Sequence, residues 1–479
     1  RIIIRMKHLF LSLFIICLAN CSVNPVTGKQ DFVMISESQE IQMGRKYNAQ
    51  ILKQNPIYQD QSLQGYVQSI GESLAANSHR PNLVYRFTVL DSPDINAFAL
   101  PGGYIYINRG LMAYLSSEEE LAAVLGHEIG HVTARHSVRQ YSQSQLMGVL
   151  STAIEINSGR TAGNLANLAS GALLSGYGRD MELEADDLGA QYIFQEGYSA
   201  QGMYEVLSVL KDQEIYSKKI AEQRGQEPRS YHGVFASHPS NDRRLQEVLN
   251  NVSVSYKQGV KNNNDIFLSK IEGMVFGDSE QSGVRRGDEF FHGSLDLFLS
   301  SPSTWEIINT PNTLVFSSPF GEAILQMTIE DLNYKESPEE YMRRFASDTY
   351  DDQILTINGF EAFTTKAIKS GRMTRMAVIF KQDQVFQFIG YLKNEDTNLS
   401  QFDTNFLKII NSFRTLKEEE KKLAKPLRLS SYRVKKEDTY KSLALKSSIA
   451  NDAEDQLRLI NGDYPDKPLS IGRVIKIVQ

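Results

Sequence analysis

Two histidines and a glutamate stand at a spacing that suits metal-dependent hydrolysis. The run Gly126-His-Glu-Ile-Gly-His131 has the form H-E-x-x-H. On a helix, positions i and i+4 lie on one face about one turn apart, so His127 and His131 can bind one zinc ion per chain. Glu128 can then reach a zinc-bound water as general base. The motif predicts a catalytic zinc site; the alternative is a solvated helix that happens to carry two histidines.

The residues around this motif are typical of a helix. Ser117 is followed three residues later by Glu120, which is the pattern of a capping box. The apolar residues that come next recur at helical spacing: Leu121, Val124, Leu125, Ile129 and Val132. We therefore expect a helix that begins after Ser117 and carries the motif.

A catalytic zinc site needs a third protein ligand and an open position for water. One class of zinc peptidase extends the motif to H-E-x-x-H-x-x-G-x-x-H. Here Ala134 and Ser137 stand at the glycine and final histidine positions of that pattern. His136 falls one residue away from the metal-binding face. This class is therefore disfavoured, and the third ligand must come from elsewhere.

A downstream acidic segment offers that ligand. In the run 179–189, Glu182, Asp186 and Gly189 fall together at i, i+4 and i+7 of a helix. Glu182 could bind zinc, Asp186 could fix the tautomer of a ligand histidine, and Gly189 could allow close helix–helix approach. An ordinary acidic surface helix is the alternative, because charged runs are usually solvated.

Together the two segments resemble a known family. Gly126–His131, followed about fifty residues later by Glu-x-x-Ala-Asp at 182–186, is similar to the zinc metallopeptidases that include the CAAX prenyl endopeptidases, HtpX and OMA peptidases. The resemblance covers about residues 24–250 and is strongest to the soluble, periplasmic lipoprotein branch. It implies a zincin-type (gluzincin) fold in which His127, His131 and Glu182 bind zinc and Glu128 is the catalytic base.

Two further segments resemble the same branch. Asn96–Asn108 looks like its strand beside the active site, and Gly103, Tyr104, Ile105 and Tyr106 are the residues expected to pair with an extended substrate. By pattern alone this is a strand after a Gly-Gly turn, and an internal core strand is the alternative.

The second segment is Ser237–Arg244, which contains a His-Pro pair. The resemblance implies that His238 is a fourth, inhibitory metal ligand, a reversible plug that displaces the catalytic water. Arg244 would steady a substrate carbonyl or the developing oxyanion. A surface histidine and a salt-bridged arginine are the alternatives.

The beginning of the chain has the order of a secretory signal. A charged pair follows Met6, and a short apolar stretch runs from Leu9 to Leu18. Leu18-Ala-Asn-Cys21 resembles a bacterial lipobox, so residues 1–21 are interpreted as a signal peptide and Cys21 as a lipidation site. An ordinary cleaved signal or an uncleaved anchor is the alternative. The predicted location is the periplasmic side of the bacterial cell envelope, and Ser22 favours the outer membrane.

The length of 479 residues exceeds what one core supports, so we expect a multidomain α+β protein. The peptidase domain should span 22–255, mainly helical with a small sheet from strands 84–90 and 104–108. The net charge of −6 gives no indication of nucleic-acid binding. No stretch after the signal is long and apolar enough to span a membrane.

The rest of the chain, from about residue 265, has a different pattern. Residues 265–415 indicate an α+β domain of unknown role, in which Trp305 is a core residue. The expected strands and helices lie at 295–299, 314–316, 323–329, 338–345, 376–380, 385–389 and 398–413. Residues 426–479 resemble a degenerate LysM module, a β-α-α-β unit, which implies contact with peptidoglycan.

The sequence therefore predicts a zinc metalloendopeptidase of the cell envelope. Its expected substrates are polypeptides, namely misfolded or assembling envelope proteins, and its role would be quality control or outer-membrane protein assembly. The alternative is a non-catalytic assembly or peptidoglycan-binding scaffold with a latent or structural zinc site. Whether the site has three protein ligands and an open position, or four, would discriminate between the two, although one protein could also combine both functions.

Overall fold

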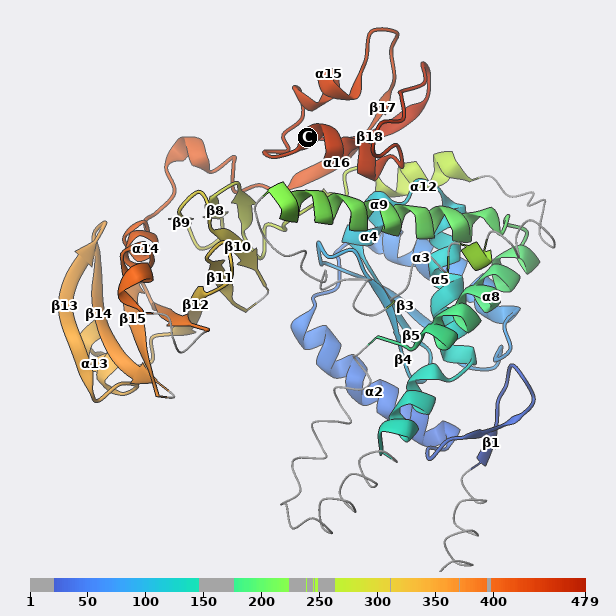
Figure 1. The fold of residues 1–479 in the computed structure, drawn as a ribbon, viewed down its shortest axis with the longest axis horizontal. Coiled ribbons are helices and arrows are strands. Elements are labelled where there is room, and N and C mark those ends of the chain that lie inside the picture. Colours follow the sequence, from blue (N-terminus) through green and yellow to red (C-terminus); the bar gives the residue numbers. More distant parts are fainter. Residues whose placement is uncertain are drawn as a thin grey trace, which may run out of the picture.

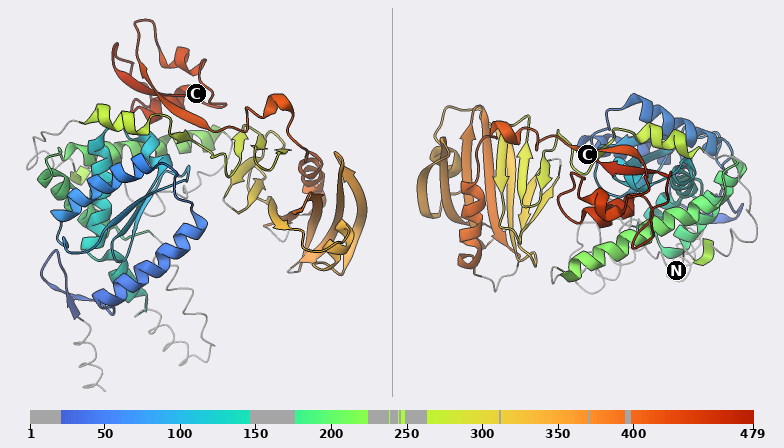
Figure 2. Two further views of the ribbon diagram at one scale, coloured as in Figure 1. Left: turned by 180° about the vertical axis from the view of Figure 1, so that it is seen from behind. Right: turned by 90° about the horizontal axis from the view of Figure 1, so that it is seen from above.

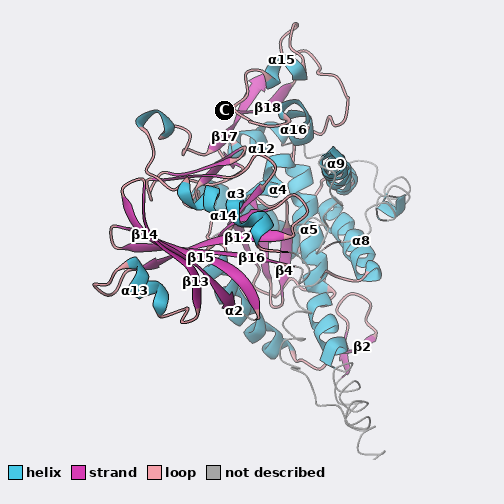
Figure 3. Cartoon of the chain, turned by 60° about the vertical axis from the view of Figure 1, so that its left-hand side comes forward, coloured by secondary structure: helices cyan, strands magenta, loops and turns pink. Residues whose placement is uncertain are grey.

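The computed structural model describes residues 21–145, 176–223, 238, 244, 246–248, 263–310, 312–369, 371–393 and 398–479. Within these ranges the chain combines helices with several separate sheets, which confirms the predicted α+β class (Figures 1 and 3). The signal segment before Cys21 lies outside the described residues. No helix in the described ranges is long and apolar enough to cross a bilayer.

A three-stranded sheet lies inside the N-terminal half. Its order is β3 (Arg86–Leu90), β5 (Tyr104–Asn108) and β4 (Ala97–Leu100). β3 runs parallel to β5, whereas β4 pairs with it antiparallel. Gly102 and Gly103, with φ of +78° and +89°, make the turn before β5.

The position of β5 corrects the expectation that Tyr104–Tyr106 binds substrate. All five residues of β5 are buried, and both sides of its backbone pair with neighbouring strands. A central strand has no free main-chain groups to offer a peptide. The internal-strand alternative is therefore correct, and among the described residues the edge strand next to the helix with the H-E-x-x-H motif is β4.

Helices pack against this sheet and against one another (Figure 1). They are α2 (Glu37–Gln54), α3 (Gln61–Ala76), α4 (Arg109–Tyr114), α5 (Glu118–Thr133), α8 (Arg179–Gln195) and α9 (Gln201–Gln223). α5, which carries the H-E-x-x-H motif, contacts α3, α8, α9 and the sheet. Nearly every residue of α5 is buried, so the predicted apolar stripe belongs to a helix that is covered all round.

α5 begins where the sequence predicts. The Ser117 hydroxyl accepts a hydrogen bond from the backbone N–H of Glu120 at 3.1 Å. The Glu120 carboxylate accepts its return bond from the N–H of Ser116 at 2.9 Å, one residue earlier than in a standard capping box. Both bonds satisfy N–H groups that a helix start would otherwise leave without partners.

Small residues bring α5 and α8 into close contact. A Cβ atom added at Gly189 of α8 would lie 2.8 Å from the backbone nitrogen of His127. One added at Gly130 of α5 would lie 2.9 Å from the carbonyl oxygen of Ala185. The predicted role of Gly189 in close helix approach is confirmed, and the two segments that carry the predicted metal ligands are thereby held side by side.

The middle of the chain forms two antiparallel sheets, which lie to one side of the helical half (Figures 1 and 2). Trp305 is buried against Phe402 and Phe406, as predicted for a core residue. Every strand and helix predicted here overlaps an observed one, whereas the observed strands at 284–286, 289–292, 306–309, 349–357 and 360–369 were not predicted. The smaller sheet contains β7 (Val284–Arg286), β8 (Glu289–His292) and β9 (Leu297–Ser300). The larger contains β10 (Glu306–Asn309), β11 (Leu314–Ser317), β12 (Ala323–Asp331), β13 (Thr349–Ile357), β14 (Phe360–Lys369), β15 (Arg372–Lys381) and β16 (Gln384–Leu392), with α13 (Pro338–Arg343) and α14 (Ser400–Asn411).

The C-terminal unit packs on the N-terminal half over α4 and α9 (Figures 1 and 2). Its elements are β17 (Leu427–Arg433), α15 (Tyr440–Ala444), α16 (Ala453–Ile460) and β18 (Val474–Val478). β17 pairs with β18 on one side and with β6 (Val275–Phe276) on the other. With α12 (Asn264–Ile271), these elements share one hydrophobic core with the N-terminal half.

Candidate metal centre

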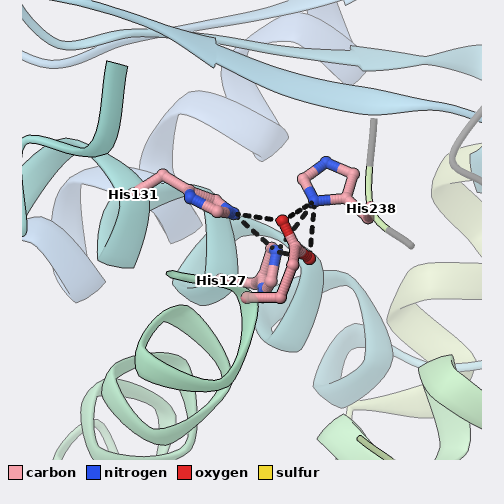
Figure 4. A group of neighbouring side chains, drawn as sticks. His127, His131 and His238 are labelled. Carbon is pink, nitrogen blue, oxygen red and sulfur yellow. Dashed lines mark hydrogen bonds and ion pairs between the residues drawn. The ribbon is translucent and has the colours of Figure 1, made fainter. Parts of the chain in front are cut away.

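Four buried side chains converge beneath the sheet (Figure 4). His127 and His131 come from one face of α5, Glu182 comes from the first turn of α8, and His238 comes from a later segment. Each side chain offers one possible ligand atom, and these four atoms all lie within 4.8 Å of one another. The structure therefore brings together all four residues that the sequence and the family resemblance suggested as metal ligands.

The spacing of these atoms fits a single tetrahedral cation. The Nε2 atoms of His127 and His131 are 2.9 Å apart, and His127 Nε2 is 3.2 Å from His238 Nδ1. Glu182 Oε1 is 3.0 Å from His238 Nδ1 and 3.5 Å from His131 Nε2. Ligands placed about 2.1 Å from one zinc ion are separated by roughly 3.3 Å. The donor set, three imidazoles and one carboxylate, also suits zinc.

His131 and Glu182 have the charge states that a metal requires, whereas His238 does not. Burial would lower the pKa of His238, but the carboxylates of Glu182 and Glu128 outweigh burial and raise this pKa to about 9. Burial lowers the pKa of His131 well below its usual value, so this imidazole is neutral. Burial would raise the pKa of Glu182, but His238, Arg244 and His127 outweigh it and the net shift is downward. Neutral imidazoles and an ionised carboxylate are the forms that bind a cation.

Glu128 lies beside the four ligands with an unused oxygen. Its Oε1 is 3.5 Å from His238 Nε2, and its buried Oε2 has no hydrogen-bond partner among the described residues. Burial raises the pKa of Glu128, although His238 and His127 oppose the shift. A carboxylate with a raised pKa and a free oxygen is suited to accept a proton within the site.

Asp186 and Arg244 form a buried ion pair against the cluster. The Arg244 guanidinium donates two hydrogen bonds of 2.7 Å to the two oxygens of Asp186. Arg244 Nη1 is also 3.0 Å from Glu182 Oε2, and Asp186 Oδ1 lies 2.9 Å from His127 Nδ1. Asp186 is thus placed to orient His127, as predicted. Arg244 adopts the salt-bridged arrangement that the sequence left open as an alternative.

His136 is the residue near this site that helical spacing missed. Its Nδ1 lies 2.8 Å from His131 Nδ1, on the side away from the cluster. α5 ends at Thr133, and Arg135 adopts a left-handed φ of +57°, so the chain turns before His136. The sequence offered a single signal for this residue, namely a further histidine five residues after His131. Helical spacing could not place it, because the position of His136 depends on that turn.

A narrow apolar pocket opens beside His127 and Glu128. Its walls come from β4, α4, α5 and α9, with His238 and Arg244 at its border. The apolar lining residues are Ala97, Leu111, Ala123, Val124, Met203, Val206, Leu207 and Leu210. The edge strand β4 also lies at this border, since His238 Nε2 is 3.4 Å from the Ala97 carbonyl oxygen. The site therefore places a strand edge and an apolar pocket next to one carboxylate.

Comparisons with known proteins agree with this geometry. Residues 61–252 match the description "Peptidase family M48". The chain is 29% identical over 269 residues to the "Beta-barrel assembly-enhancing protease" of Yersinia pestis, covering 54% of this chain and 53% of that protein. It is 31% identical to the "Mitochondrial metalloendopeptidase OMA1" of Arabidopsis thaliana over 33% of each chain. "Metalloprotease YcaL" of Escherichia coli is 29% identical, over 38% of this chain and 68% of that one. The chain spans about half the length of the first of these relatives.

Proposed function

We propose that this chain, whose residues 61–252 belong to peptidase family M48, is a zinc-dependent endopeptidase of the bacterial cell envelope. One observation carries the proposal: the side chains of His127, His131 and Glu182 meet with a buried, unpartnered oxygen of Glu128 beside them. A structural zinc site needs no such base, whereas hydrolysis does.

The chain's own residues divide the work of peptide hydrolysis between them. His127, His131 and Glu182 would hold zinc, which when bound polarises a carbonyl group and acidifies water. Glu128 accepts the proton of the attacking water through its free oxygen and passes it to the leaving amine. Asp186 keeps His127 in the tautomer whose Nε2 faces the cluster. Burial of these groups excludes bulk water from the reaction.

The substrate is proposed to be an extended polypeptide that pairs with β4. β4 is one of the two edge strands of its sheet among the described residues, and strand edges bind extended peptides through main-chain hydrogen bonds. The apolar pocket beside Glu128 would take an apolar side chain adjacent to the scissile bond. Arg244 would mainly hold Asp186 in place. It would also contact a substrate oxygen.

His238 is proposed to close the site. Its Nδ1 fills the fourth position of the cluster, and its Nε2 faces the edge strand at Ala97. A substrate paired with β4 would have to displace this side chain. His238→Ala should therefore raise basal cleavage of an unstructured protein such as casein, while zinc content stays near one per chain. Unchanged or lower activity with full zinc would contradict the plug.

The catalytic role is tested by Glu128→Gln in the zinc-loaded protein. Replacing a buried carboxylate by its amide keeps the shape and leaves the three principal ligands in place. Cleavage should fall by at least about a hundredfold, the usual contribution of a general base, with zinc content unchanged. Asp180→Asn, which neutralises an exposed acidic residue on α8, is the matched control for loss of charge. A zinc-replete Glu128→Gln variant with wild-type cleavage would refute the mechanism.

A second function, a scaffold with a latent or structural zinc, is favoured by one observation. Four protein atoms, not three, converge in the structure, and structural zinc sites are usually closed in this way. Under this interpretation His238→Ala gains no activity and loses zinc. Complementation in cells separates the two functions, because a scaffold would be fully restored by Glu128→Gln and an enzyme would not.

The setting in the cell is also part of the proposal. Lipidation at Cys21 would anchor the chain on the periplasmic side of the outer membrane, and the C-terminal unit would act as a LysM-like contact with peptidoglycan. The expected substrates are misfolded or assembling envelope proteins, supported by the relatives named beta-barrel assembly-enhancing proteases. Comparing envelope proteins of cells that carry wild-type or Glu128→Gln chain would identify them.

A further inference from the structure

A second line of polar side chains runs away from the metal cluster behind His131. His131 Nδ1 is 2.8 Å from His136 Nδ1, and His136 Nε2 is 3.0 Å from Glu184 Oε2. Arg139 Nη1 donates to the same glutamate oxygen at 2.9 Å. His131 and His136 are almost completely buried, whereas Glu184 lies partly exposed at the end of the line.

Metal binding by His131 would determine which ring nitrogens of His131 and His136 carry a proton. A histidine that binds through Nε2 carries its proton on Nδ1. Two N–H groups cannot face each other at 2.8 Å, so His131 Nδ1–H must donate to an unprotonated His136 Nδ1. The proton of neutral His136 is then on Nε2, from which it donates to Glu184.

Glu184 is a permanent acceptor at the end of the line. Its carboxylate accepts a hydrogen bond from His136 on one side and from the permanently charged guanidinium of Arg139 on the other, so two donors fix its position. An ionised acceptor strengthens the hydrogen bond from His136 and fixes the tautomer of that ring.

The ring of His131 is also held in its plane. Tyr177 stacks on it with 4.0 Å between ring centroids and 18° between planes. The Tyr177 hydroxyl lies 2.7 Å from Ser137 Oγ, which anchors the aromatic ring in turn. Stacking restrains tilting of the imidazole, whereas the hydrogen bond to His136 restrains rotation about its own axis.

We propose that His136 is a positioning residue for metal binding, which acts through His131 and is itself oriented by Glu184. The two ligand histidines of α5 would then be oriented differently. His127 faces the carboxylate of Asp186 directly, at 2.9 Å, whereas His131 reaches a carboxylate only through a second imidazole. This inference rests on the metal site of the proposed function, but not on peptide cleavage.

The test compares two replacements of His136. His136→Phe keeps a ring of similar shape but removes the acceptor, so zinc affinity should fall about 10- to 100-fold, as for other orienting partners. His136→Asn can accept from His131 through Oδ1 in the place of Nδ1 and should restore most of the affinity. Zinc affinity is measured by chelator competition. The absorption spectrum of the cobalt(II) form reports the ligand geometry independently, and should change in the Phe variant only.

His79→Phe is the matched control, because His79 bonds the Tyr192 hydroxyl and takes no part in the cluster. Glu184→Gln covers the case in which the Phe variant does not fold. It changes a partly exposed side chain and should weaken zinc binding about tenfold.

Wild-type affinity and an unchanged cobalt spectrum in His136→Phe or Glu184→Gln would overturn the proposal. An Asn variant as weak as the Phe variant would do the same. A wild-type chain that binds zinc without cleaving protein would refute only the proposed function, whereas one that binds no zinc would overturn both.

Discussion

The ion pair of Asp186 and Arg244 allows a quantitative test of how the site is built. Asp186→Asn keeps the size of the side chain but removes its charge. Arg244 is 3% exposed, so it would be left buried without its main counterion. Removing one partner of a buried pair costs about 3–5 kcal/mol, and the remaining contact of Arg244 with Glu182 at 3.0 Å favours the lower end.

We therefore expect the free energy of unfolding to fall by about 3 kcal/mol, which for a domain of this size lowers Tm by roughly 6–12 °C. Zinc affinity should weaken about 10- to 100-fold, because His127 loses the charged acceptor that orients it. Thermal unfolding followed by circular dichroism, with chelator and with zinc, measures the first effect, and chelator competition measures the second. Asp180→Asn, an exposed change on the same helix, is the control.

A double variant separates the two effects. Asp186→Leu with Arg244→Met removes both buried charges, and replacing a buried pair by apolar side chains is often neutral for stability. Stability should therefore recover while zinc affinity stays low. If zinc affinity recovers as well, Asp186 does not orient His127. If Asp186→Asn itself changes neither quantity, the ion pair does not form as the structure has it.

Three further outcomes follow from other contacts. Burial and then the neighbouring Glu205 raise the pKa of Glu119 to about 7. The folded state therefore retains this proton, and the free energy of unfolding falls as pH rises from about 4.5 to 7. Glu119→Gln should raise the free energy of unfolding by about 1 kcal/mol at pH 8 and leave it unchanged at pH 4. This value is smaller than the full pKa shift implies, because Glu119 is partly exposed. Equal urea midpoints at pH 8 would contradict this. Lys476 of β18 donates to the carbonyl oxygens of Ala113 and Leu115. Lys476→Met should therefore lower the free energy of unfolding in urea by about 1–3 kcal/mol. An unchanged urea midpoint would show that the C-terminal unit does not depend on this contact. Removing zinc held at a hundredfold excess over its Kd should cost about 2.7 kcal/mol, and Glu182→Gln should lose most of that response in calorimetry.

Much of the site was predictable because its residues lie on helices whose geometry is local. The spacing of His127 and His131, and of Glu182, Asp186 and Gly189, follows from 3.6 residues per turn. The start of α5 follows from the capping chemistry of Ser117 and Glu120. The resemblance to a family then suggested that the two helices meet, which no periodicity could show.

The middle unit shows a different limit of sequence patterns. Strands rich in apolar residues, such as β12, β15 and β16, were predicted. β13 was not, because it is an edge strand whose residues are nearly all exposed and so carry no alternation. β14 was missed because threonine and lysine interrupt its apolar residues.

What the sequence determined by itself is the chemistry available: two imidazoles and a base on one helix, and two carboxylates on another. Tertiary structure alone decided which groups face each other. The left-handed turn at Arg135 returns His136 to His131, and pairing on both sides makes β5 internal, which leaves β4 as the edge. Packing selects the hydrogen-bonded partners that are distant along the chain. At Gly189 the absence of a side chain lets the backbones of α8 and α5 approach each other. Local spacing predicts that Gly189 allows a close approach, but not which backbone it meets.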